Sequence, residues 1–321
     1  MLRTLPVDNL IRLNMKPMAD INCTFDQHGD PNGDRLLLQA LWDDLRARRE
    51  FLTSPYLPAC FAFFIHILLC SPFLVFEALG CFWPRMHFYR ISRNAEPLGL
   101  CLQRWVDCFW RIFIKYLTTI LPASALYQSV RNPIFPELAP SWRVLIAEVI
   151  ACLLLFDALF FIWHYSMHRV PWLYRIVHQA HHQNRITFAL TAQDASPAEL
   201  LSLQVLALTS AWVVGCHPLS EALFHLLNTW LAVEDHCGYD LPWALHRLLP
   251  CFGGAPFHQA HHHVYRGNYA PYFRHWDWLC GTYLRVREEA GRKHGGRTMR
   301  RRRRRKSLGS DCVCMCTYNK A

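Results

Sequence analysis

The chain has 321 residues, a formal net charge of +10 and 52% hydrophobic residues. Its length alone fits one or two soluble domains. However, the apolar residues cluster in runs long enough to cross a bilayer. The 14 cysteines follow no spacing pattern, so we interpret most of them as small buried hydrophobic residues and not as a disulfide framework. Residues 1–20 contain no sustained apolar core, so no signal peptide is predicted.

Residues 1–55 are predicted to be a polar N-terminal segment. Asn22-Cys23-Thr24 is an N-glycosylation sequon, which predicts a glycan on Asn22 if this end of the chain faces a secretory lumen. Residues 36–49 place leucines and Trp42 on one side and arginines on the other, a pattern that predicts an amphipathic helix. Such a helix fits either a membrane surface or a place against the rest of the protein.

Four hydrophobic stretches follow and predict an all-α fold, a multi-span bundle of helices in a membrane. They cover residues 56–83, 109–130 and 144–163, and a helical hairpin over 200–233 that turns at Cys216-His217-Pro218. Prolines and occasional charges inside them are tolerated better in membrane helices than in soluble ones. We expect four divisions: the polar segment 1–55, the first two spans with their loops in 56–143, a catalytic domain in 144–285, and a disordered basic tail in 286–321.

Histidines mark the catalytic domain. Fourteen of the 18 lie between His164 and His275, most of them in three boxes with spacings of three or four residues. Side chains at these spacings share one face of a helix, and imidazole is a common metal ligand. The boxes contain His164, His168, His178, His181, His182, His258, His261 and His262. Eight ligands exceed what one ion with an open position can use, so the sequence predicts an all-histidine two-metal centre. Imidazole leaves Zn, Cu, Fe and Ni open.

Two acidic motifs lie beside further candidate ligands. His236 follows Glu234 and Asp235 and is a ninth candidate, with the two carboxylates as acceptors that would orient an imidazole. His275 is either a ligand or a group that supports one, with Asp277 as its partner.

Asp157 precedes His164 by two helical turns on the same face, about 10.8 Å away and too far to bind the same metal. It is expected either to line the deep end of a substrate cavity or to make a plain hydrogen bond between helices. Asp157 and Asp235 are the candidates for a catalytic side chain.

Lysine and arginine favour cytosolic loops, and this rule assigns sides to the bundle. Residues 84–104, residues 169–185 and the tail after Arg285 should be cytosolic, whereas residues 131–143 and the N-terminus should be lumenal. All three boxes then form a cytosolic histidine-rich cap. The run from Arg297 to Lys306 is interpreted as a tail attracted to anionic membrane lipid, and no nucleic-acid partner is expected.

Several motifs carry a resemblance to a known family. They are Leu153-Leu-Leu-Phe-Asp157, Val170-Pro-Trp-Leu-Tyr-Arg175, His181-His-Gln-Asn184, Gly215-Cys-His-Pro218, Val233-Glu-Asp-His236 and Ala270-Pro-Tyr-Phe273. With the ordered boxes, residues 30–285 resemble the membrane fatty acid hydroxylase superfamily, which includes sterol hydroxylases, sterol methyl oxidases and sterol desaturases.

This resemblance implies a di-iron, O2-dependent sterol monooxygenase in the membrane of the endoplasmic reticulum. The implied reaction places a hydroxyl on the side chain of cholesterol, with electrons from NAD(P)H relayed by a haem protein and a reductase in the membrane. The eight box histidines and His236 would bind iron. Some members carry another histidine at the position of Ala232, so water or His275 would supply a tenth ligand here.

Two alternatives stay open at the level of sequence. One is another di-iron lipid oxygenase, such as a fatty acid hydroxylase, a sterol C4-methyl oxidase or a desaturase, because the boxes define the oxidant and not the substrate. The other is a non-catalytic sterol-binding membrane protein. Intact boxes argue against the second, since a binding protein has no need to keep eight metal ligands.

Overall fold

The computed structural model describes residues 33–92, 97–131 and 133–285. Over these ranges the chain is helical and contains no β-strand, only two isolated bridges, Arg90 with Tyr239 and Phe252 with Phe273. The all-α prediction is therefore confirmed. Asn22 and the tail 286–321 lie outside the described residues. The glycan on Asn22 and the disordered basic tail therefore stay predictions.

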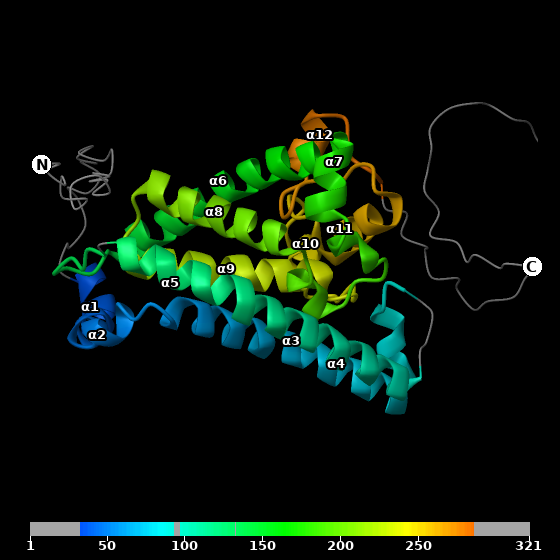
Figure 1. The fold of residues 1–321 in the computed structure, drawn as a ribbon, viewed down its shortest axis with the longest axis horizontal. Coiled ribbons are helices and arrows are strands. Elements are labelled where there is room, and N and C mark those ends of the chain that lie inside the picture. Colours follow the sequence, from blue (N-terminus) through cyan, green and yellow to red (C-terminus); the bar gives the residue numbers. More distant parts are fainter. Residues whose placement is uncertain (1–32, 93–96, 132, 286–321) are drawn as a thin grey trace, which may run out of the picture.

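Six long helices lie side by side and form an elongated bundle (Figure 1). They are α3 (Leu57–Phe82), α4 (Leu98–Lys115), α5 (Leu121–Val130), α6 (Trp142–Arg169), α8 (Pro197–Val214) and α9 (Pro218–His236). At one end lie α7 (Pro171–Leu173), α10 (Leu245–Leu248), α11 (Gly254–Val264) and α12 (His275–Leu279), and at the other end lie α1 (Gly33–Ala47) and α2 (Arg49–Leu52). Short 3-10 or π segments are η2 (Pro84–Tyr89), η3 (Tyr116–Ile120), η4 (Tyr174–His178), η5 (His181–Gln183) and η6 (Ala189–Gln193).

Local sequence signals set where the central helices begin and end. Ser141 caps α6 by accepting a hydrogen bond from the backbone N–H of Val144, and Ser196 caps α8 in the same way through Glu199. Gly215 ends α8 with a left-handed φ of 66°, and Pro218 begins α9 three residues later. The predicted hairpin therefore turns where the sequence placed its turn.

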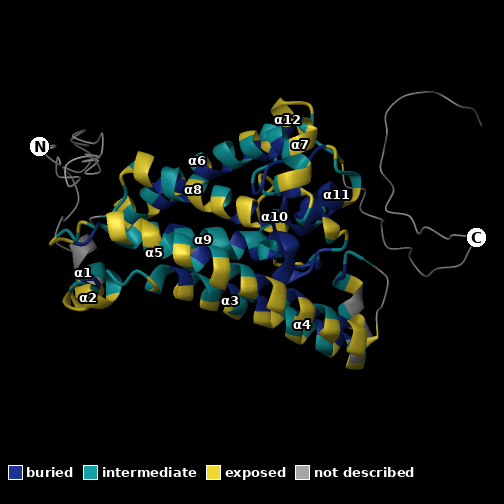
Figure 2. Cartoon of the chain, viewed as in Figure 1, coloured by how far each residue is buried: buried dark blue, intermediate teal, exposed yellow. Residues whose placement is uncertain are grey.

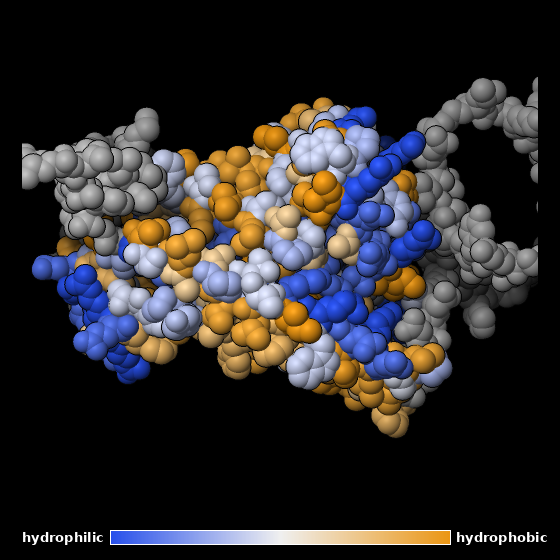
Figure 3. All heavy atoms as spheres, viewed as in Figure 1, coloured by the Kyte–Doolittle hydropathy of each residue, from blue (hydrophilic) through white to orange (hydrophobic). Residues whose placement is uncertain are grey.

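In the part of the chain that the structure describes, three helices are long and apolar enough to cross a membrane: Leu57–Gly80, Trp142–Arg169 and Pro197–Val214. Large apolar side chains such as Phe64, Ile150 and Val205 are exposed on these helices. Figure 2 shows exposed positions along the whole length of the bundle. In Figure 3 hydrophilic residues gather at the two ends of the visible face. Exposed apolar area of this extent is typical of lipid contact, and the chain is a membrane protein.

The predicted second span, 109–130, is helical but is not among these three helices. It belongs to a longer run in which the π-helical turn η3 separates α4 from α5. Arg111 and Lys115 lie near this turn, and both contact the buried carboxylate of Asp194, at 2.7 and 2.8 Å. Burial opposes ionisation of Asp194, but the hydrogen bonds from these two cations outweigh burial and lower its pKa to about 2. The sequence predicted that these two side chains extend toward the membrane surface. In the structure they pair with Asp194.

The predicted amphipathic helix is α1, and it contacts the bundle. Trp42 is buried, its indole N–H donates to the carbonyl of Pro136 at 2.8 Å, and its ring lies edge-on to His217. The sequence left two locations open for this helix, a membrane surface or a place against the rest of the protein. The side that carries Trp42 packs against the rest of the protein.

Candidate metal centre

Nine histidines converge at one end of the bundle in two groups. The first group contains His164, His168, His178, His182 and His261, and the second contains His181, His236, His258 and His262. Within each group, one ring nitrogen of every member lies within 4.8 Å of those of the others, and all members except His168 are buried. The eight box histidines and His236 are therefore brought together as the sequence predicted.

Local backbone structure divides the boxes between the two groups. His164 and His168 lie one turn apart on α6 and both belong to the first group. The second box lies on the π-helical turn η4 and the 3-10 turn η5. As a result, His181 belongs to the second group, whereas His178 and His182 belong to the first. On α11, His261 likewise belongs to the first group, while His258 and His262 belong to the second. The second and third boxes thus each contribute to both groups.

The spacing of the ring nitrogens fits metal coordination. In the first group the Nε2 atom of His178 lies 2.9 Å from those of both His164 and His182. In the second group the Nε2 atom of His236 lies 3.2 Å from that of His181 and 3.0 Å from that of His258. Two nitrogens that bind one metal ion at about 2.1 Å and at right angles stand about 3.0 Å apart. Each group therefore has the spacing of a set of ligands around one ion.

The two groups adjoin each other. Rings from different groups approach closely: His182 and His262 have centroids 4.7 Å apart, and His178 and His181 have centroids 5.5 Å apart. The arrangement is that of a two-metal centre, in which both ions can act on one bound molecule.

Burial keeps these imidazoles in the neutral form that binds a metal. It lowers the pKa of His178 to about 3, and it lowers the pKa of His181 and, together with neighbouring histidines, that of His261. The side-chain nitrogens named above thus present lone pairs at neutral pH, whereas protonated rings would repel both one another and a cation.

Backbone carbonyls orient three of the rings. Nδ1 of His164 donates to the carbonyl of Tyr269 at 2.7 Å. Nδ1 of His261 donates to the carbonyl of Gly267 at 2.8 Å. His236 makes the same contact with Ala232 at 2.8 Å, the position where some superfamily members carry another histidine. A proton on Nδ1 leaves the lone pair of Nε2 directed into the group.

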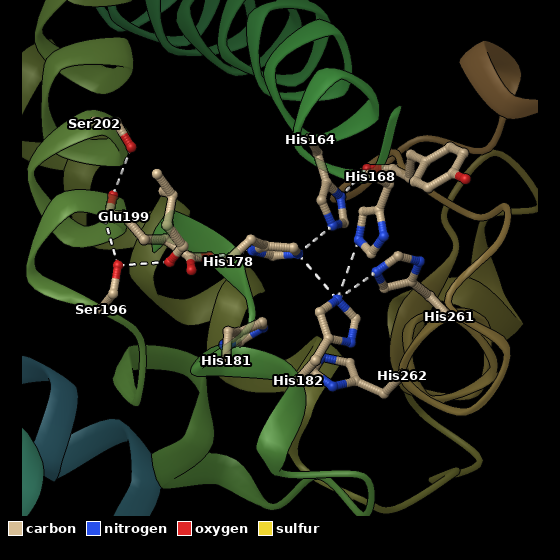
Figure 4. Close-up of polar contacts among 12 residues, drawn as sticks. His164, His168, His178, His181, His182, Ser196, Glu199, Ser202, His261 and His262 are labelled. Atoms are coloured by element: carbon tan, nitrogen blue, oxygen red, sulfur yellow. Dashed lines mark hydrogen bonds and ion pairs between the residues drawn. The ribbon is translucent and has the colours of Figure 1, made fainter. Parts of the chain in front are cut away.

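A carboxylate takes this role at His178. Glu199, buried in the first turn of α8, accepts a hydrogen bond from Nδ1 of His178 at 2.9 Å. In Figure 4, His178 points from this glutamate toward His164, His182 and the other rings of the first group.

Other predicted site residues lie elsewhere. His275 is exposed, packs against Trp276 and belongs to neither group, so the prediction that it could be a ligand is not supported by its position. Its expected partner Asp277 instead accepts the backbone N–H groups of Tyr269 and Ala270. Asp157 likewise accepts backbone N–H groups, those of Tyr272 and Phe273, so its contact is structural but is made to a non-helical segment and not to a second helix.

The acidic pair beside His236 was predicted to orient an imidazole of the centre. Glu234 instead lies 3.6 Å from Nδ1 of His246, and Nδ1 of His236 donates to the backbone carbonyl of Ala232 in its own helix. Asp235 is buried next to Glu234. It remains a candidate for a catalytic side chain, with no observed contact to the histidine groups.

Sequence reasoning missed two supporting residues. Glu199 lies 21 residues from His178, and its only signal was the capping pattern Ser196-x-x-Glu199, which marks the start of a helix and says nothing about its partner. Gln259, inside the third box, accepts from the backbone and hydroxyl of Thr187 and donates to the carbonyl of Arg185. It ties α11 to the loop after the second box.

Comparison with known proteins agrees with this geometry. Residues 149–282 match the family model for fatty acid hydroxylase. The chain is 39% identical over 267 residues to human cholesterol 25-hydroxylase, covering 83% of this chain and 97% of that protein. It is 40% identical to a cholesterol 25-hydroxylase-like protein of Danio rerio over 76% of this chain and 97% of that protein.

A methylsterol monooxygenase of Aspergillus fumigatus is 34% identical over 68% of this chain and 73% of its own length. No solved structure matches significantly. The relatives are hydroxylases and monooxygenases of lipids, which supports an oxidoreductase. The chain belongs to the fatty acid hydroxylase family.

Proposed function

We propose that this protein is a di-iron, O2-dependent monooxygenase of the endoplasmic reticulum membrane that hydroxylates the side chain of cholesterol and forms 25-hydroxycholesterol. The observation that carries the proposal is the pair of adjoining histidine groups at one end of an apolar helix bundle. The identity to cholesterol 25-hydroxylases over most of the chain supports the substrate.

The oxidation that the relatives' names describe favours a redox-active metal, for which we propose iron. The groups contain histidine only, which leaves Zn, Cu, Fe and Ni open on ligand type. Zinc has no redox chemistry, whereas the relatives' names describe oxidation. Two iron ions would occupy the two groups, five histidines holding one and four holding the other.

The bound iron ions would supply the oxidation of an unactivated C–H bond by O2, using electrons relayed from NAD(P)H by a haem protein and a reductase. The chain's own residues provide the setting for that step. Carbonyls of Tyr269, Gly267 and Ala232 hold three imidazoles in the metal-binding tautomer, and burial holds the rings neutral. The buried position of the groups excludes water, and the outer faces of α3, α6 and α8 border the lipid from which a sterol would enter.

The proposed sidedness places the centre in the cytosol. Residues 133–141, between α5 and α6, lie at the opposite end of the bundle from α11 (Figure 1). This agrees with a lumenal position for residues 131–143 and a cytosolic one for the histidines, as the distribution of Lys and Arg predicts. A protease or alkylation assay on sealed microsomes would test it.

A second candidate within the same chemistry is another lipid oxygenase, such as a sterol C4-methyl oxidase. The similarity to a methylsterol monooxygenase favours keeping it. Both candidates need the same metal centre, and they differ in which carbon of the sterol is presented to it.

Product analysis separates them. Cells expressing the wild type, or a His261→Ala/His262→Ala variant that removes one ligand from each group, would be analysed for sterols and fatty acids by mass spectrometry. We expect 25-hydroxycholesterol from the wild type only. A different oxidised lipid, still dependent on the histidines, would redirect the substrate. Well-expressed, iron-loaded wild type that makes no oxidised lipid when supplied with reductant would contradict the proposal.

A further inference from the structure

We infer that Glu199 is a positioning residue of the first histidine group, where its carboxylate orients His178 and strengthens it as a ligand, so that the two metal ions are bound unequally. The inference rests on the proposed metal centre and deepens it. It concerns a residue outside the histidine boxes, on a different helix from the ring it supports.

Glu199 is placed by the fold to do this. Its side chain is buried, with a relative exposure of 2%, and its Oε1 atom lies 2.9 Å from Nδ1 of His178. Carboxylate oxygens in a protein interior need hydrogen-bond partners. In the described structure, Oε1 of Glu199 accepts from Nδ1–H of His178, and Oε2 has no partner. An ionised carboxylate in this position makes a charge-assisted hydrogen bond to Nδ1, which is stronger than a hydrogen bond to a neutral acceptor.

A second contact holds the two elements together. The hydroxyl of Ser196, which caps α8, donates to the carbonyl of Val177, the residue before His178. The same hydroxyl accepts from the backbone N–H of Glu199. The first turn of α8 is therefore joined to η4 at two points, through Ser196 and the backbone of Val177 and through Glu199 and the ring of His178 (Figure 4). The backbone contact sets the separation of the two elements that the side chains of Glu199 and His178 bridge.

The partner of His178 differs from those of the other oriented rings. Those of His164, His261 and His236 are neutral backbone carbonyls. A carboxylate pulls the Nδ1 proton more strongly than a carbonyl does, which raises the basicity of Nε2 and brings negative charge close to the ion. No ring of the second group makes such a hydrogen bond among the described residues, so the hydrogen bond itself acts on a ligand of the first ion, although the charge of Glu199 also lies near His181.

His178 is also well placed to pass this effect on. Its Nε2 atom is 2.9 Å from those of both His164 and His182. It therefore lies close to two other ligands of the first group, and a change in its orientation would alter the position of the ion with respect to them.

The test uses full-length protein purified in detergent, stripped of metal and titrated with Fe(II) without oxygen. Glu199→Gln keeps the shape and an oxygen that can accept from Nδ1, but removes the charge. Glu199→Leu removes both. The control is Glu221→Gln, because Glu221 also lies in the first turn of a helix and also makes an ion pair, with Arg131 at 2.8 Å, but it contacts no histidine of either group.

We expect two binding phases for wild type and control. In Glu199→Gln one phase should weaken about 10- to 100-fold, the usual effect of removing a group that supports a metal ligand, while the other stays unchanged. The reduction potential of the more weakly bound ion, followed by its spectrum, should rise. The variant lacks a negative charge that would stabilise the oxidised form of the ion. Glu199→Leu should retain a single tight ion.

Unchanged affinities and potentials in both Glu199 variants would overturn the inference. So would loss of folding in Glu199→Gln, or equal weakening of both phases, because the residue would then support the structure as a whole. Wild type that binds two ions with these properties but forms no hydroxysterol would contradict the proposed function and leave this result standing.

Discussion

Asp157 accepts a hydrogen bond from the backbone N–H of Tyr272 at 2.9 Å, and the same Oδ1 atom accepts that of Phe273 at 3.1 Å. The carboxylate lies in the middle of α6 and is fully buried, and the two amides belong to the segment after the third box. A single side chain thus anchors this segment to a membrane helix. The nearby carbonyl of Tyr269 orients His164, so the anchor also holds part of the metal centre in place.

Replacing Asp157 should therefore reduce stability more than chemistry. Asp157→Ala leaves two buried amides unpaired, at a cost of about 1–3 kcal/mol for each, so the thermal unfolding midpoint should fall by several degrees. Asp157→Asn keeps an accepting oxygen and should lose less. Thermal unfolding of detergent-purified protein, followed by size-exclusion chromatography, measures both. An Ala variant as stable as the wild type would contradict this role and favour a place for Asp157 in the substrate cavity.

His246 gives the stability a dependence on pH. Burial alone would lower its pKa, but the hydrogen bond to Asp240, at 2.9 Å, and the nearby carboxylate of Glu234, at 3.6 Å, raise it to about 9. The unfolded chain has a histidine pKa of about 6.5. The folded state therefore holds the proton more tightly, and this stabilisation is complete below about pH 6.5 and is lost as the pH rises through 9.

The expected outcome is an unfolding midpoint that declines between pH 6.5 and 9 by more in the wild type than in His246→Gln, which cannot carry the charge. Asp240 also accepts a hydrogen bond from Arg247, so in the His246→Gln variant the carboxylate of Asp240 still has a charged partner. Equal slopes for the two proteins over this range would show that the proton on His246 does not stabilise the fold.

Regular spacing explains why much of this architecture was predictable. The boxes at i and i+4 gave the ligands because helix geometry alone puts such residues on one face, and long apolar runs gave α3, α6 and the hairpin. The irregular turns η4 and η5 could not be read in advance. They distribute His178 and His181 to different groups, because the π-helical and 3-10 turns do not keep the side-chain directions of a regular α-helix.

Contacts over long sequence separations were also hidden. Asp194 pairs with Arg111 across 83 residues, and Glu199 reaches His178 across 21. No local pattern links such partners, since a helix sequence records which face is apolar and not what covers it. The predicted partnership of Asp277 with His275 was wrong for the opposite reason: the residues are neighbours, but backbone amides at Tyr269 and Ala270 claim the carboxylate.

A pair of histidine variants tests the assignment of ligands. His236→Ala should remove one of four ligands from the second group, whereas His275→Ala removes an exposed ring that belongs to neither group. We expect iron binding to weaken by at least about tenfold at one site in His236→Ala and to stay normal in His275→Ala. Metal content measured by mass spectrometry on the purified proteins checks this. A loss of iron in His275→Ala would restore it as the tenth ligand.

Removing the metal should destabilise the centre itself. Without a cation, the lone pairs of neutral rings face one another at 2.9 Å between His178 and His182 and at 3.0 Å between His236 and His258. Bound metal stabilises the folded state by about 2.7 kcal/mol when its concentration is 100 times the dissociation constant. A strong iron chelator should therefore lower the unfolding midpoint of the wild type by several degrees. Chelator should have little effect on His261→Ala/His262→Ala, and an equal drop in both proteins would mean that the chelator acts without removing a bound ion.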